Sequence, residues 1–333
     1  MLGLSSGLPY EGIVVDHPGD IDGLVAWWDF TDSSSLWQDI DGFDVGTEVT
    51  TQEEPIGRCK NKAYVNDQQL GRFIRASTDL NRPIYYTNGV NDLSYAWFFG
   101  NATGGTTNQH LIMKSDSTDW GADSTDVISA LPIINSALSI WIIADPGGLN
   151  DSSGNDETVL SYRGWRGTDT SYADEEQSTS FAFQRETDDD IKATWYLTSS
   201  GSTTPPVSPN AIAAVQSFSH WDDLAIINIQ TKSGIGASNI YNNNKPDVGE
   251  TVFDTNSAIH PSLRQEGVIT LDNSVWDDSK VSKFCVGANY SGDGDFFNGK
   301  IYEILIYSIS TPNESQRASL NSYFAQKYSI TLQ

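Results

Sequence analysis

The chain has few of the residues that define several common protein classes. Only two cysteines occur in 333 residues, Cys59 and Cys285, which excludes a disulfide-rich scaffold. Each is expected to be a small buried apolar residue, with a bridge between the two as the alternative. No apolar run approaches the roughly 18 residues that a membrane-spanning helix needs, so we predict no membrane span.

Basic residues are also scarce. The sequence holds 19 Lys and Arg against 44 Asp and Glu, a formal net charge of −25, and no basic residue precedes Arg58. Such a surface repels the phosphate backbone of nucleic acids, so nucleic acid is not expected as a partner. The acidity favours solubility, and binding of divalent cations by acidic clusters is the alternative.

The N-terminal segment has neither the positive charge nor the continuous apolar core of a signal peptide. Residues 1–22 are rich in Gly, Pro and Asp and show no helical period. We predict an extended arm that docks on a partner, because a segment without its own core gains order on binding. Synthesis is expected in the cytoplasm, without export by a signal peptide.

The chain does contain a succession of short apolar runs separated by turns of Gly, Asn, Asp and Ser. This punctuation, with little helical periodicity, predicts an all-β fold of two antiparallel sheets. Long polar loops between the runs are expected at the surface, where binding sites usually lie. The expected strands are Leu24–Phe30, Ala96–Phe99, Ala137–Ala144, Thr158–Tyr162, Ser180–Arg185, Ile191–Thr198, Leu224–Thr231 and Ser238–Tyr241.

The last fifty residues carry the most detailed prediction. Two β-rich runs, 283–290 and 295–307, flank a Gly- and Asp-rich turn and are expected to form a hairpin or neighbouring strands. Both faces of the second run are mostly apolar, so this strand is expected to be covered on both sides. Simple alternation divides its side chains into Tyr302, Ile304 and Ile306 on one face, and Ile301, Glu303, Leu305 and Tyr307 on the other.

A helix is predicted after this run. Thr311 and Glu314 have the spacing of a capping box, and Pro312 would occupy the first helical position, where a missing N–H group costs nothing. One apolar stripe then recurs at helical spacing and is expected to dock on the sandwich. It consists of Leu320, Tyr323, Phe324 and Tyr328.

Several segments, taken in order, carry a family likeness. They are Gly23–Phe30, Pro55–Lys62, Arg82 with Pro83, Leu138–Ile143, Trp221–Ile226, Phe297–Tyr307 and the ending Asn313–Ile330. Together they resemble concanavalin A-like, laminin G-type jelly-roll domains, and more narrowly the version found in virion structural proteins of tailed, particularly marine, bacteriophages. The likeness covers residues 23–333, so the chain is expected to divide into an arm, 1–22, and a jelly-roll domain, 23–333, with loop insertions.

The resemblance implies a two-sheet jelly-roll sandwich in which the first and last strands, Leu24–Phe30 and Lys300–Tyr307, lie side by side. It implies a non-enzymatic virion protein, either a capsid decoration or a neck, tail or fibre component. The protein would be present in several copies or as a homo-oligomer and would be held to other virion proteins by residues 1–22. Weak adhesion to host-surface glycans is the expected role of its loops. The alternatives are a glycan-cleaving enzyme of the laminarinase type and a free carbohydrate-binding module.

The enzymatic alternatives lack their sequence signatures. The paired-carboxylate pattern of laminarinases, Glu-x-Asp-x-x-Glu, is missing, and the nearest run, Glu186–Ile191, lacks the last acid. Gly3–Gly7 matches the nucleophile-elbow pattern but has no preceding strand or following helix. The four histidines are scattered without metal-binding spacing, which disfavours a zinc site.

Three tryptophans in polar contexts are the predicted glycan contacts. A flat aromatic ring stacks on the apolar face of a pyranose, and a neighbouring carboxylate or guanidinium makes paired hydrogen bonds. Tryptophans in loops also fill protein interfaces, which stays open as the alternative. The predicted pairs are Trp120 with Asp123, Trp165 with Arg166, and Trp276 with Asp277. Four tryptophans in strand-like runs are expected in the core instead: Trp27, Trp97, Trp141 and Trp195.

Two acid-rich turns are candidate calcium sites. Asp151, Asp156 and Glu157 lie in the first, and Asp293 and Asp295 in the second. Calcium accepts hard oxygen ligands in flexible geometry, although neither turn has EF-hand spacing. Asp and Asn are also favoured in turns because they bond their own backbone, which is the alternative explanation.

Overall fold

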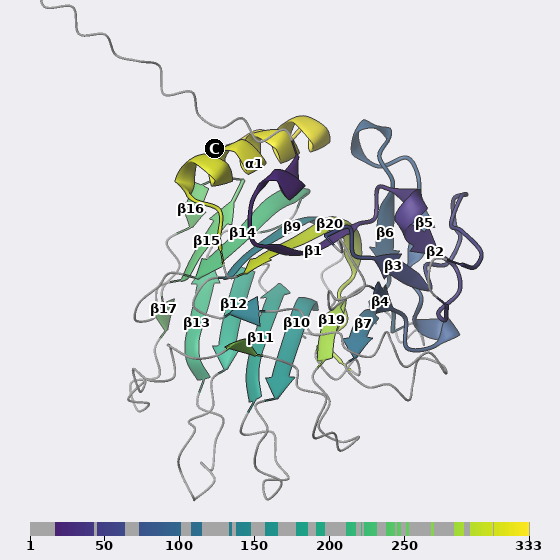
Figure 1. Ribbon diagram of the computed structural model, residues 1–333, viewed down its shortest axis with the longest axis horizontal. Helices are drawn as coiled ribbons and strands as arrows, with labels where there is room; N and C mark the ends of the chain where they lie inside the picture. Colours follow the sequence, from purple (N-terminus) through teal and green to yellow (C-terminus); the bar gives the residue numbers. More distant parts are fainter. Residues whose placement is uncertain are drawn as a thin grey trace, which may run out of the picture.

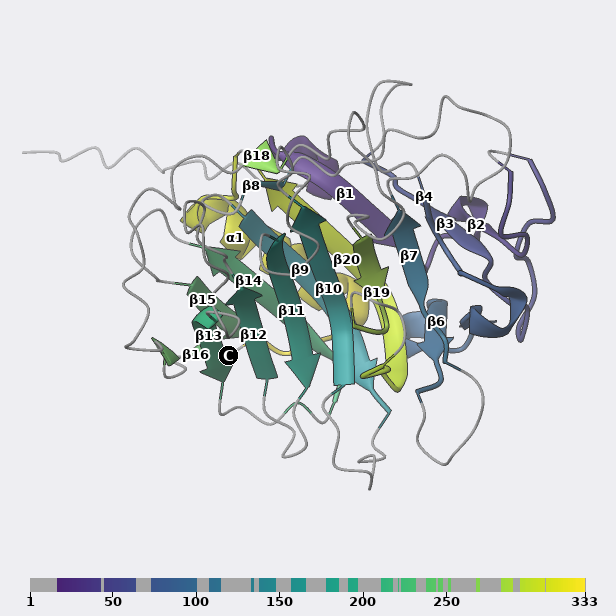
Figure 2. The same cartoon turned by 90° about the horizontal axis from the view of Figure 1, so that it is seen from below.

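The protein is built in three layers, two β-sheets and one helix (Figures 1 and 2). The larger sheet lies below the smaller one in Figure 1, and helix α1 (Glu314–Tyr328) covers the outer face of the smaller sheet. The prediction of a two-sheet antiparallel sandwich closed by a C-terminal helix is confirmed. This computed structural model describes residues 17–42, 45–63, 73–100, 108–114, 133–134, 138–147, 157–165, 178–185, 191–196, 211–217, 221, 223–231, 238–243, 245–247, 251–252, 268–269, 283–289, 294–308 and 310–332.

Within these residues the smaller sheet, called the helix-side sheet, has eight strands. They are β1 (Leu24–Asp29), β5 (Ile84–Tyr86), β6 (Tyr95–Phe98), β9 (Leu138–Pro146), β14 (Ala225–Thr231), β15 (Ser238–Asn242), β16 (Lys245–Asp247) and β20 (Gly299–Ser308). Their order is β16-β15-β14-β9-β20-β6-β5, and β1 also pairs with β20.

The opposite sheet has ten described strands, in the order β17-β13-β12-β11-β10-β19-β7-β4-β3-β2. They are β2 (Leu36–Trp37), β3 (Arg58–Lys60), β4 (Phe73–Arg75), β7 (Leu111–Lys114), β10 (Glu157–Trp165), β11 (Ser178–Arg185), β12 (Ile191–Tyr196), β13 (Ala211–Ser217), β17 (Thr251–Val252) and β19 (Lys283–Val286). A small pair is formed by β8 (Ile133–Ile134) and β18 (Val268–Ile269). Four short 3₁₀ helices complete the described elements: η1 (Pro18–Asp20), η2 (Ser33–Ser35), η3 (Asp79–Asn81) and η4 (Val90–Asp92).

Strand β20 is the centre of the helix-side sheet. It pairs along its whole length with β9, and on its other edge it pairs with β6 at residues 299–301 and with β1 at residues 303–307. The prediction that the first and last strands lie side by side is therefore confirmed. Every strand expected from the sequence is present, although most bounds shift by one or two residues.

A β-bulge interrupts β20 and changes which side chains share a face. In the pairing with β9 the register shifts between Ile301 and Glu303, so Tyr302 is the extra residue. A bulge re-aims side chains because two residues on one strand then oppose one on its partner. Simple alternation therefore gave a wrong division: Tyr302 joins Leu305 on the helix side, and Ile301 joins the core between the sheets.

The two C-terminal runs do not form a hairpin. Strand β19 pairs with β10 and β7 in the opposite sheet, whereas β20 belongs to the helix-side sheet. The prediction of neighbouring strands is wrong, because the connection crosses from one sheet to the other. Such crossings are how a sandwich joins its two layers, and composition of the turn alone does not distinguish them from a hairpin.

Apolar side chains fill both interfaces between the layers. The core between the sheets includes Trp28, Ile304 and Phe284, all buried. The core under the helix joins Trp141 and Leu305 of the helix-side sheet to the predicted stripe of α1. Leu320, Phe324 and Tyr328 of that stripe have no exposed surface, which confirms both the docking of the helix and the coverage of β20 on both faces.

The helix begins two residues later than the capping-box prediction placed it. Asn313 is the N-cap: its side chain accepts from the backbone N–H of Gln316, and the Gln316 side chain accepts from the backbone N–H of Asn313. The predicted box of Thr311 and Glu314 is wrong. Two overlapping candidates at the same spacing competed, and the Asn/Gln pair satisfies the same two N–H groups.

Other core predictions have mixed outcomes. Both cysteines are buried and are not joined in a disulfide, and Trp27 and Trp141 are buried, as expected. Trp97 is only partly buried, and Trp195 belongs to β12, whose side chains lie outside the described residues. Among the residues described, no helix is long and apolar enough to cross a membrane.

The last residues of the predicted arm contact the sandwich. The Tyr307 hydroxyl donates to the carbonyl of Pro18 at 2.9 Å, and Ile21 packs in the core under the helix. Residues 17–22 are thus anchored to the domain, while residues 1–16 lie outside the described part of the chain. The division into an arm and a domain stays a prediction.

Candidate functional site

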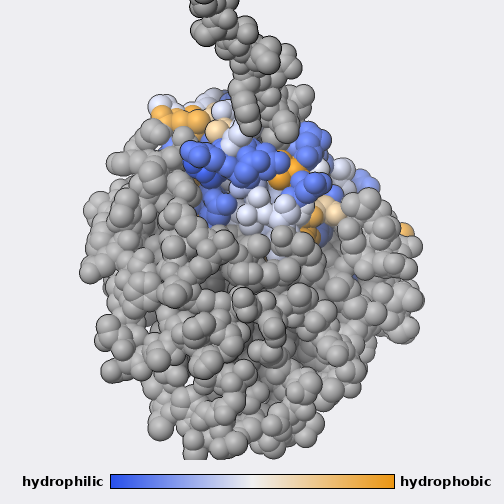
Figure 3. All heavy atoms as spheres, turned by 60° about the vertical axis from the view of Figure 1, so that its left-hand side comes forward, coloured by the Kyte–Doolittle hydropathy of each residue, from blue (hydrophilic) through white to orange (hydrophobic). Residues whose placement is uncertain are grey.

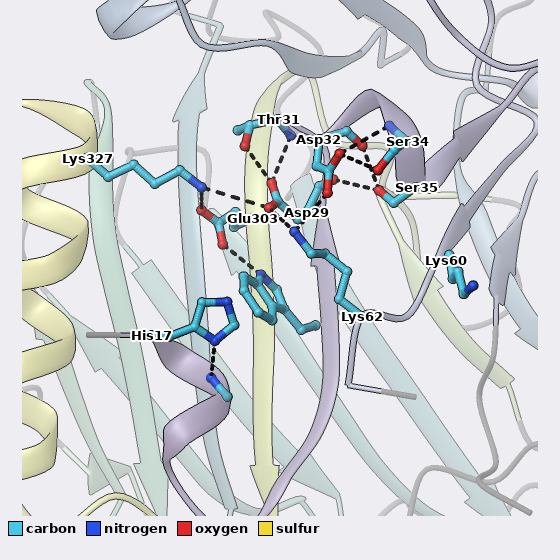
Figure 4. A network of polar contacts seen from close by, with 12 residues as sticks. His17, Asp29, Thr31, Asp32, Ser34, Ser35, Lys60, Lys62, Glu303 and Lys327 are labelled. Carbon is cyan, nitrogen blue, oxygen red and sulfur yellow. Dashed lines mark hydrogen bonds and ion pairs between the residues drawn. The ribbon is translucent and has the colours of Figure 1, made fainter. Parts of the chain in front are cut away.

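Two carboxylates meet under the helix, on the outer face of the helix-side sheet. Asp29 of β1 and Glu303 of β20 are register partners in neighbouring strands, and both are buried, Glu303 completely. Burying carboxylates is costly unless each charge is paired and its oxygens are hydrogen-bonded. The surrounding residues meet that requirement, as Figure 4 shows.

Glu303 is hydrogen-bonded at both oxygens. The indole N–H of Trp27 donates to Oε2 at 2.7 Å. The Tyr328 hydroxyl and the Lys327 ammonium, both from the last turn of α1, donate to Oε1. Three groups from two elements thus hold one carboxylate, and two of them belong to the helix that covers it.

Asp29 links this group to a second lysine. Lys62 donates to Asp29 at 2.9 Å and to Asp32 at 3.0 Å, and its ammonium lies 4.5 Å from the centroid of the Trp27 ring. Lys327 approaches Asp29 at 3.9 Å. We call Asp29, Glu303, Lys62 and Lys327 the buried ion cluster; its two carboxylates and two ammonium groups balance in charge.

The pKa values reflect this arrangement. Burial and the charge of Asp29 raise the pKa of the Glu303 carboxyl above its ordinary 4.5, although Lys327 opposes that shift. Burial alone would lower the pKa of Lys327, but the charges of Glu303 and Asp29 raise it above 10.5. Each lysine faces two carboxylates, so both ammonium groups are held charged. The cluster fixes the C-terminal turn of α1 on the sheet.

A cavity opens beside that turn, and we take it as the candidate binding site. Its volume is about 610 Å³, within the range of roughly 300–1,000 Å³ that small-molecule sites occupy. Its walls come from the loop before β6, the ends of β9 and β20, the segments flanking β14 and β15, and the end of α1. The lining residues are Asn88, Gly89, Val90, Tyr95, Asp145, Asp223, Leu224, Asn243, Lys300, Tyr302, Tyr328, Ser329, Ile330 and Thr331.

The charged groups at the cavity are one ion pair, Lys300 with Asp145, and the exposed carboxylate of Asp223. Lys300 of β20 and Asp145 of β9 are cross-strand partners whose side chains form an ion pair at 2.6 Å. The Lys300 ammonium also lies 5.7 Å from the ring centroids of Tyr95 and Trp97, near enough for a cation–π interaction. Asp223 is exposed.

The bulge of β20 supplies one aromatic wall. Tyr302 lies between Tyr95 and Tyr328, with ring centroids 5.4 Å and 5.3 Å away, and its hydroxyl lies close to the backbone of Val90. Gly89 allows this close approach, since a Cβ there would lie 2.9 Å from the Tyr302 hydroxyl and 2.6 Å from the Leu93 carbonyl. A side chain at position 89 would therefore push this wall apart.

The loop that carries Asn88 and Gly89 is tied to the end of the helix. The Asn91 side chain donates to the carbonyl of Lys327 at 2.8 Å and accepts from the Ser329 hydroxyl at 2.9 Å. Asn88, Asn91 and Ser329 all have positive φ, between 51° and 68°, a conformation that Asn tolerates better than most residues. The buried ion cluster and this loop together set the shape of the cavity.

Asn243, which follows β15, offers an amide to the cavity. Its side-chain oxygen accepts from the backbone N–H of Ile226 at 2.9 Å, which fixes the orientation of the carboxamide. Within the described residues its NH₂ group donates to no partner. A cavity with the edge of Tyr95, a fixed amide, hydroxyl groups and an ion pair can bind a polyhydroxylated ring, since sugars present both hydroxyl groups and apolar C–H faces.

The solvent-facing side of α1 contrasts with this cavity. Its exposed residues include Glu314, Ser315, Ser322 and Gln326, and the described surface in Figure 3 is mostly hydrophilic with small hydrophobic spots. The exposed side of α1 is therefore mostly polar.

The predicted glycan contacts fall mostly outside the described residues. Trp165 ends β10, but its side chain is not among those described. The remaining predicted contacts lie outside: Trp120, Asp123, Arg166, Trp276 and Asp277. These residues stay predictions, and none of them is part of the cavity lining given above.

The two candidate calcium turns are brought together at their described ends. The backbone N–H of Thr158, next to Glu157, donates to the carbonyl of Asp295 at 2.6 Å. The Glu157 carboxylate is buried and pairs with Arg185 at 3.4 Å, so one of its oxygens already faces a cation. Asp151, Asp156 and Asp293 lie outside the described residues, and within the described part no group of three or more His, Cys, Asp or Glu could hold a metal ion. Calcium binding stays a prediction.

Sequence reasoning missed the cavity because its residues come from six separate segments. One signal was available: Asn88-Gly89 is a tight-turn pair, and it precedes the aromatic strand β6. The bulge that turns Tyr302 toward the cavity has no such local signal.

Comparison with known proteins gives no family assignment. No protein-family model matches the chain, and no curated protein sequence matches it. Three solved structures with a similar fold illustrate what is found. A sialidase from Trypanosoma rangeli in complex with sialic acid is 11% identical over 92% of this chain and 33% of its own, with a TM-score of 0.37.

The other two have lower TM-scores. A mutant NanB sialidase from Streptococcus pneumoniae is 13% identical over 58% of this chain and 24% of its own, with a TM-score of 0.32. The CBM40 of the Ruminococcus gnavus IT-sialidase, bound to alpha2,6 sialyllactose, is 11% identical over 55% of this chain and 82% of its own, with a TM-score of 0.33. The chain spans about a quarter to a third of these two sialidases, and at such TM-scores the likenesses carry no argument about its activity.

Proposed function

We propose that this β-sandwich binds carbohydrate without cleaving it, at the cavity between the end of α1 and the helix-side sheet. One observation carries the proposal: a cavity of about 610 Å³ brings fixed polar groups together with Tyr95, which is 8% exposed, while Tyr302 and Tyr328 also line it but are buried. Protein sites for sugars need both kinds of surface, because ring C–H groups stack on aromatic side chains while hydroxyl groups need donors and acceptors.

The positions of the carboxylates favour binding over cleavage. Glycoside hydrolysis uses two carboxyl groups about 5–10 Å apart on either side of the scissile bond. Asp29 and Glu303 are close together, but Glu303 has no exposed surface and α1 covers it, so a sugar has no access. At the cavity, Asp145 is engaged by Lys300 at 2.6 Å.

The proposal is tested by blocking the cavity. Thr331 is an exposed lining residue, so Thr331→Trp is expected to narrow the cavity without disturbing the core. Ser322→Trp, on the exposed side of α1, is the matched control. On a glycan array, Thr331→Trp should bind at least tenfold more weakly than the wild type, a loss of roughly 1.4 kcal/mol in binding free energy. Ser322→Trp should bind as the wild type does. Equal binding by both variants, or no binding by the wild type, would contradict the proposal.

Release of reducing sugar from β-glucans measures the competing enzymatic function. No release is expected from the wild-type protein. Release that disappears in Asp145→Asn or Asp223→Asn would replace the binding proposal with a hydrolytic one.

Display on a phage particle is proposed from the sequence resemblance alone. Residues 17–22 contribute to the domain through Pro18 and Ile21, so deleting all of residues 1–22 would also disturb the fold. Deleting residues 1–16 is the cleaner test. Incorporation into particles should be lost if these residues dock the protein, and unchanged incorporation would remove that role.

A further inference from the structure

The charged groups of the cavity determine which sugars it can take. Among the described lining residues these groups are two carboxylates, Asp145 and Asp223, and one ammonium, Lys300. Their formal net charge is −1. A site for an acidic sugar needs the opposite sign, because a carboxylate or sulfate is held by charge-assisted hydrogen bonds from Lys or Arg.

The single ammonium group among the described lining residues is already engaged. Lys300 is bound to Asp145 at 2.6 Å, and its ammonium also lies 5.7 Å from the ring centroids of Tyr95 and Trp97. Burial alone would lower the pKa of Lys300, but the hydrogen bond and charge of Asp145 raise it. An acidic ligand would have to compete with Asp145 for this ammonium while lying near Asp223.

The remaining polar groups are neutral. Asn88, Asn243, Ser329 and Thr331 line the cavity, and their amides and hydroxyl groups can both donate to and accept from sugar hydroxyls. The whole chain adds a formal charge of −25, which lowers the local concentration of any anion, although salt screens this effect beyond about 8 Å at physiological ionic strength. Local and global charge therefore act in the same direction.

We propose that the ligand of this cavity is an uncharged saccharide, and that Asp145 and Asp223 exclude sialylated, uronic and sulfated sugars. This inference rests on the proposed carbohydrate binding. It adds a prediction of selectivity, with Asp145 and Asp223 as the residues that determine it.

The test compares matched probes on one array: neutral oligosaccharides and the same cores carrying sialic acid or sulfate. The wild-type protein should bind the neutral member of each pair at least tenfold better. The variant Asp145→Asn/Asp223→Asn changes the formal charge of the lining to +1 and frees Lys300. Its preference should shift toward the acidic members by roughly tenfold, whereas Asp79→Asn, at an exposed aspartate outside the cavity, should leave the preference unchanged.

Three outcomes distinguish the proposed selectivity for uncharged saccharides from the proposed carbohydrate binding on which it rests. Stronger wild-type binding to acidic members, lost in Thr331→Trp, would overturn the inference and leave the carbohydrate site intact. An unchanged preference in the double variant, with a thermal unfolding midpoint near that of the wild type, would overturn the role of the two aspartates. Should the double variant unfold early, Asp223→Asn alone, an exposed substitution, gives the same comparison with about half the shift. Absence of binding to any glycan would overturn the proposed function itself.

Discussion

Strand β20 contributes one residue to each of two lysine–carboxylate pairs. Lys300 and Glu303 are only three positions apart, but their pairs serve different purposes. Glu303 belongs to the buried ion cluster, where its side chain is fully inaccessible and that of Lys327 is 20% exposed. Lys300 pairs with Asp145 at the cavity, where the two side chains are 28% and 21% exposed. The same chemistry therefore anchors a helix at one point and faces a binding site at the other.

Burial of the carboxylate explains the difference. An ion pair near the surface contributes about 0–1 kcal/mol because water solvates its charges and salt screens them. Removing one partner of a buried pair costs roughly 3–5 kcal/mol, since the other charge is left without compensation. The comparison predicts that the cluster sets stability and that the Asp145–Lys300 pair sets selectivity.

The largest expected effect comes from Glu303→Ala. It would leave the Lys327 ammonium, the Trp27 indole N–H and the Tyr328 hydroxyl without their shared acceptor. We expect a loss of roughly 3–5 kcal/mol in the free energy of unfolding, measured by urea denaturation. Glu314→Ala, at an exposed position of α1, should stay within about 0.5 kcal/mol of the wild type. A small effect of Glu303→Ala would show that water reaches the cluster.

The second-largest effect is expected at alkaline pH, which should remove the stability that the buried ion cluster provides. The folded-state pKa values of Lys62 and Lys327 lie above 10.5 because carboxylate charges outweigh burial, and burial raises the pKa of Tyr328 well above 10.0. A raised folded-state pKa gives stability that is complete below the unfolded value and is lost as pH rises through the folded one. The free energy of unfolding should therefore fall above about pH 10.

The comparison with Lys327→Met assigns this loss to the cluster. The variant should be less stable than the wild type at neutral pH, and the gap between them should narrow as the pH rises above about 10. Urea midpoints measured across this range test the expectation. A stability difference that stays constant with pH would mean that the loss of stability at alkaline pH arises elsewhere in the protein.

The cap at the other end of α1 should have a smaller effect than the cluster. Asn313→Ala removes one half of the capping box and is expected to cost about 1 kcal/mol. Thr311→Ala, at the position that the sequence favoured, should cost less than about 0.5 kcal/mol. Thermal unfolding of the two variants identifies the N-cap. A larger loss of stability in Thr311→Ala than in Asn313→Ala would show that Thr311 is the N-cap, as the sequence predicted.

The sequence predicted the regular parts of this fold well for a physical reason. Runs such as Leu138–Ile143 are apolar, short and bounded by turns, so their strand character is a local property. The stripe of Leu320, Phe324 and Tyr328 follows helical spacing, and its burial against the sheet follows from that spacing alone.

The site was less predictable because it depends on departures from regularity. Alternation places Tyr302 and Glu303 on opposite faces, yet the bulge in the pairing with β9 turns both toward the helix. Whether a strand bulges depends on its partners, here β6 and β1 meeting at the same edge of β20. No pattern within β20 itself contains that information.

The smallest stability effect is expected at the Asp145–Lys300 pair, and it completes the comparison along β20. A double-mutant cycle with Asp145→Asn and Lys300→Met should give a coupling of about 0.5–1 kcal/mol in the free energy of unfolding. The side chains remain partly exposed, so the ammonium and carboxylate regain solvation when either partner is removed. A coupling of several kcal/mol would mean that the cavity is as dry as the interface under α1, and its charges would then have to be assigned to the fold. A small coupling together with an altered preference for acidic glycans would separate the two roles: Glu303 would hold the helix, and Asp145, paired with Lys300, would select the ligand.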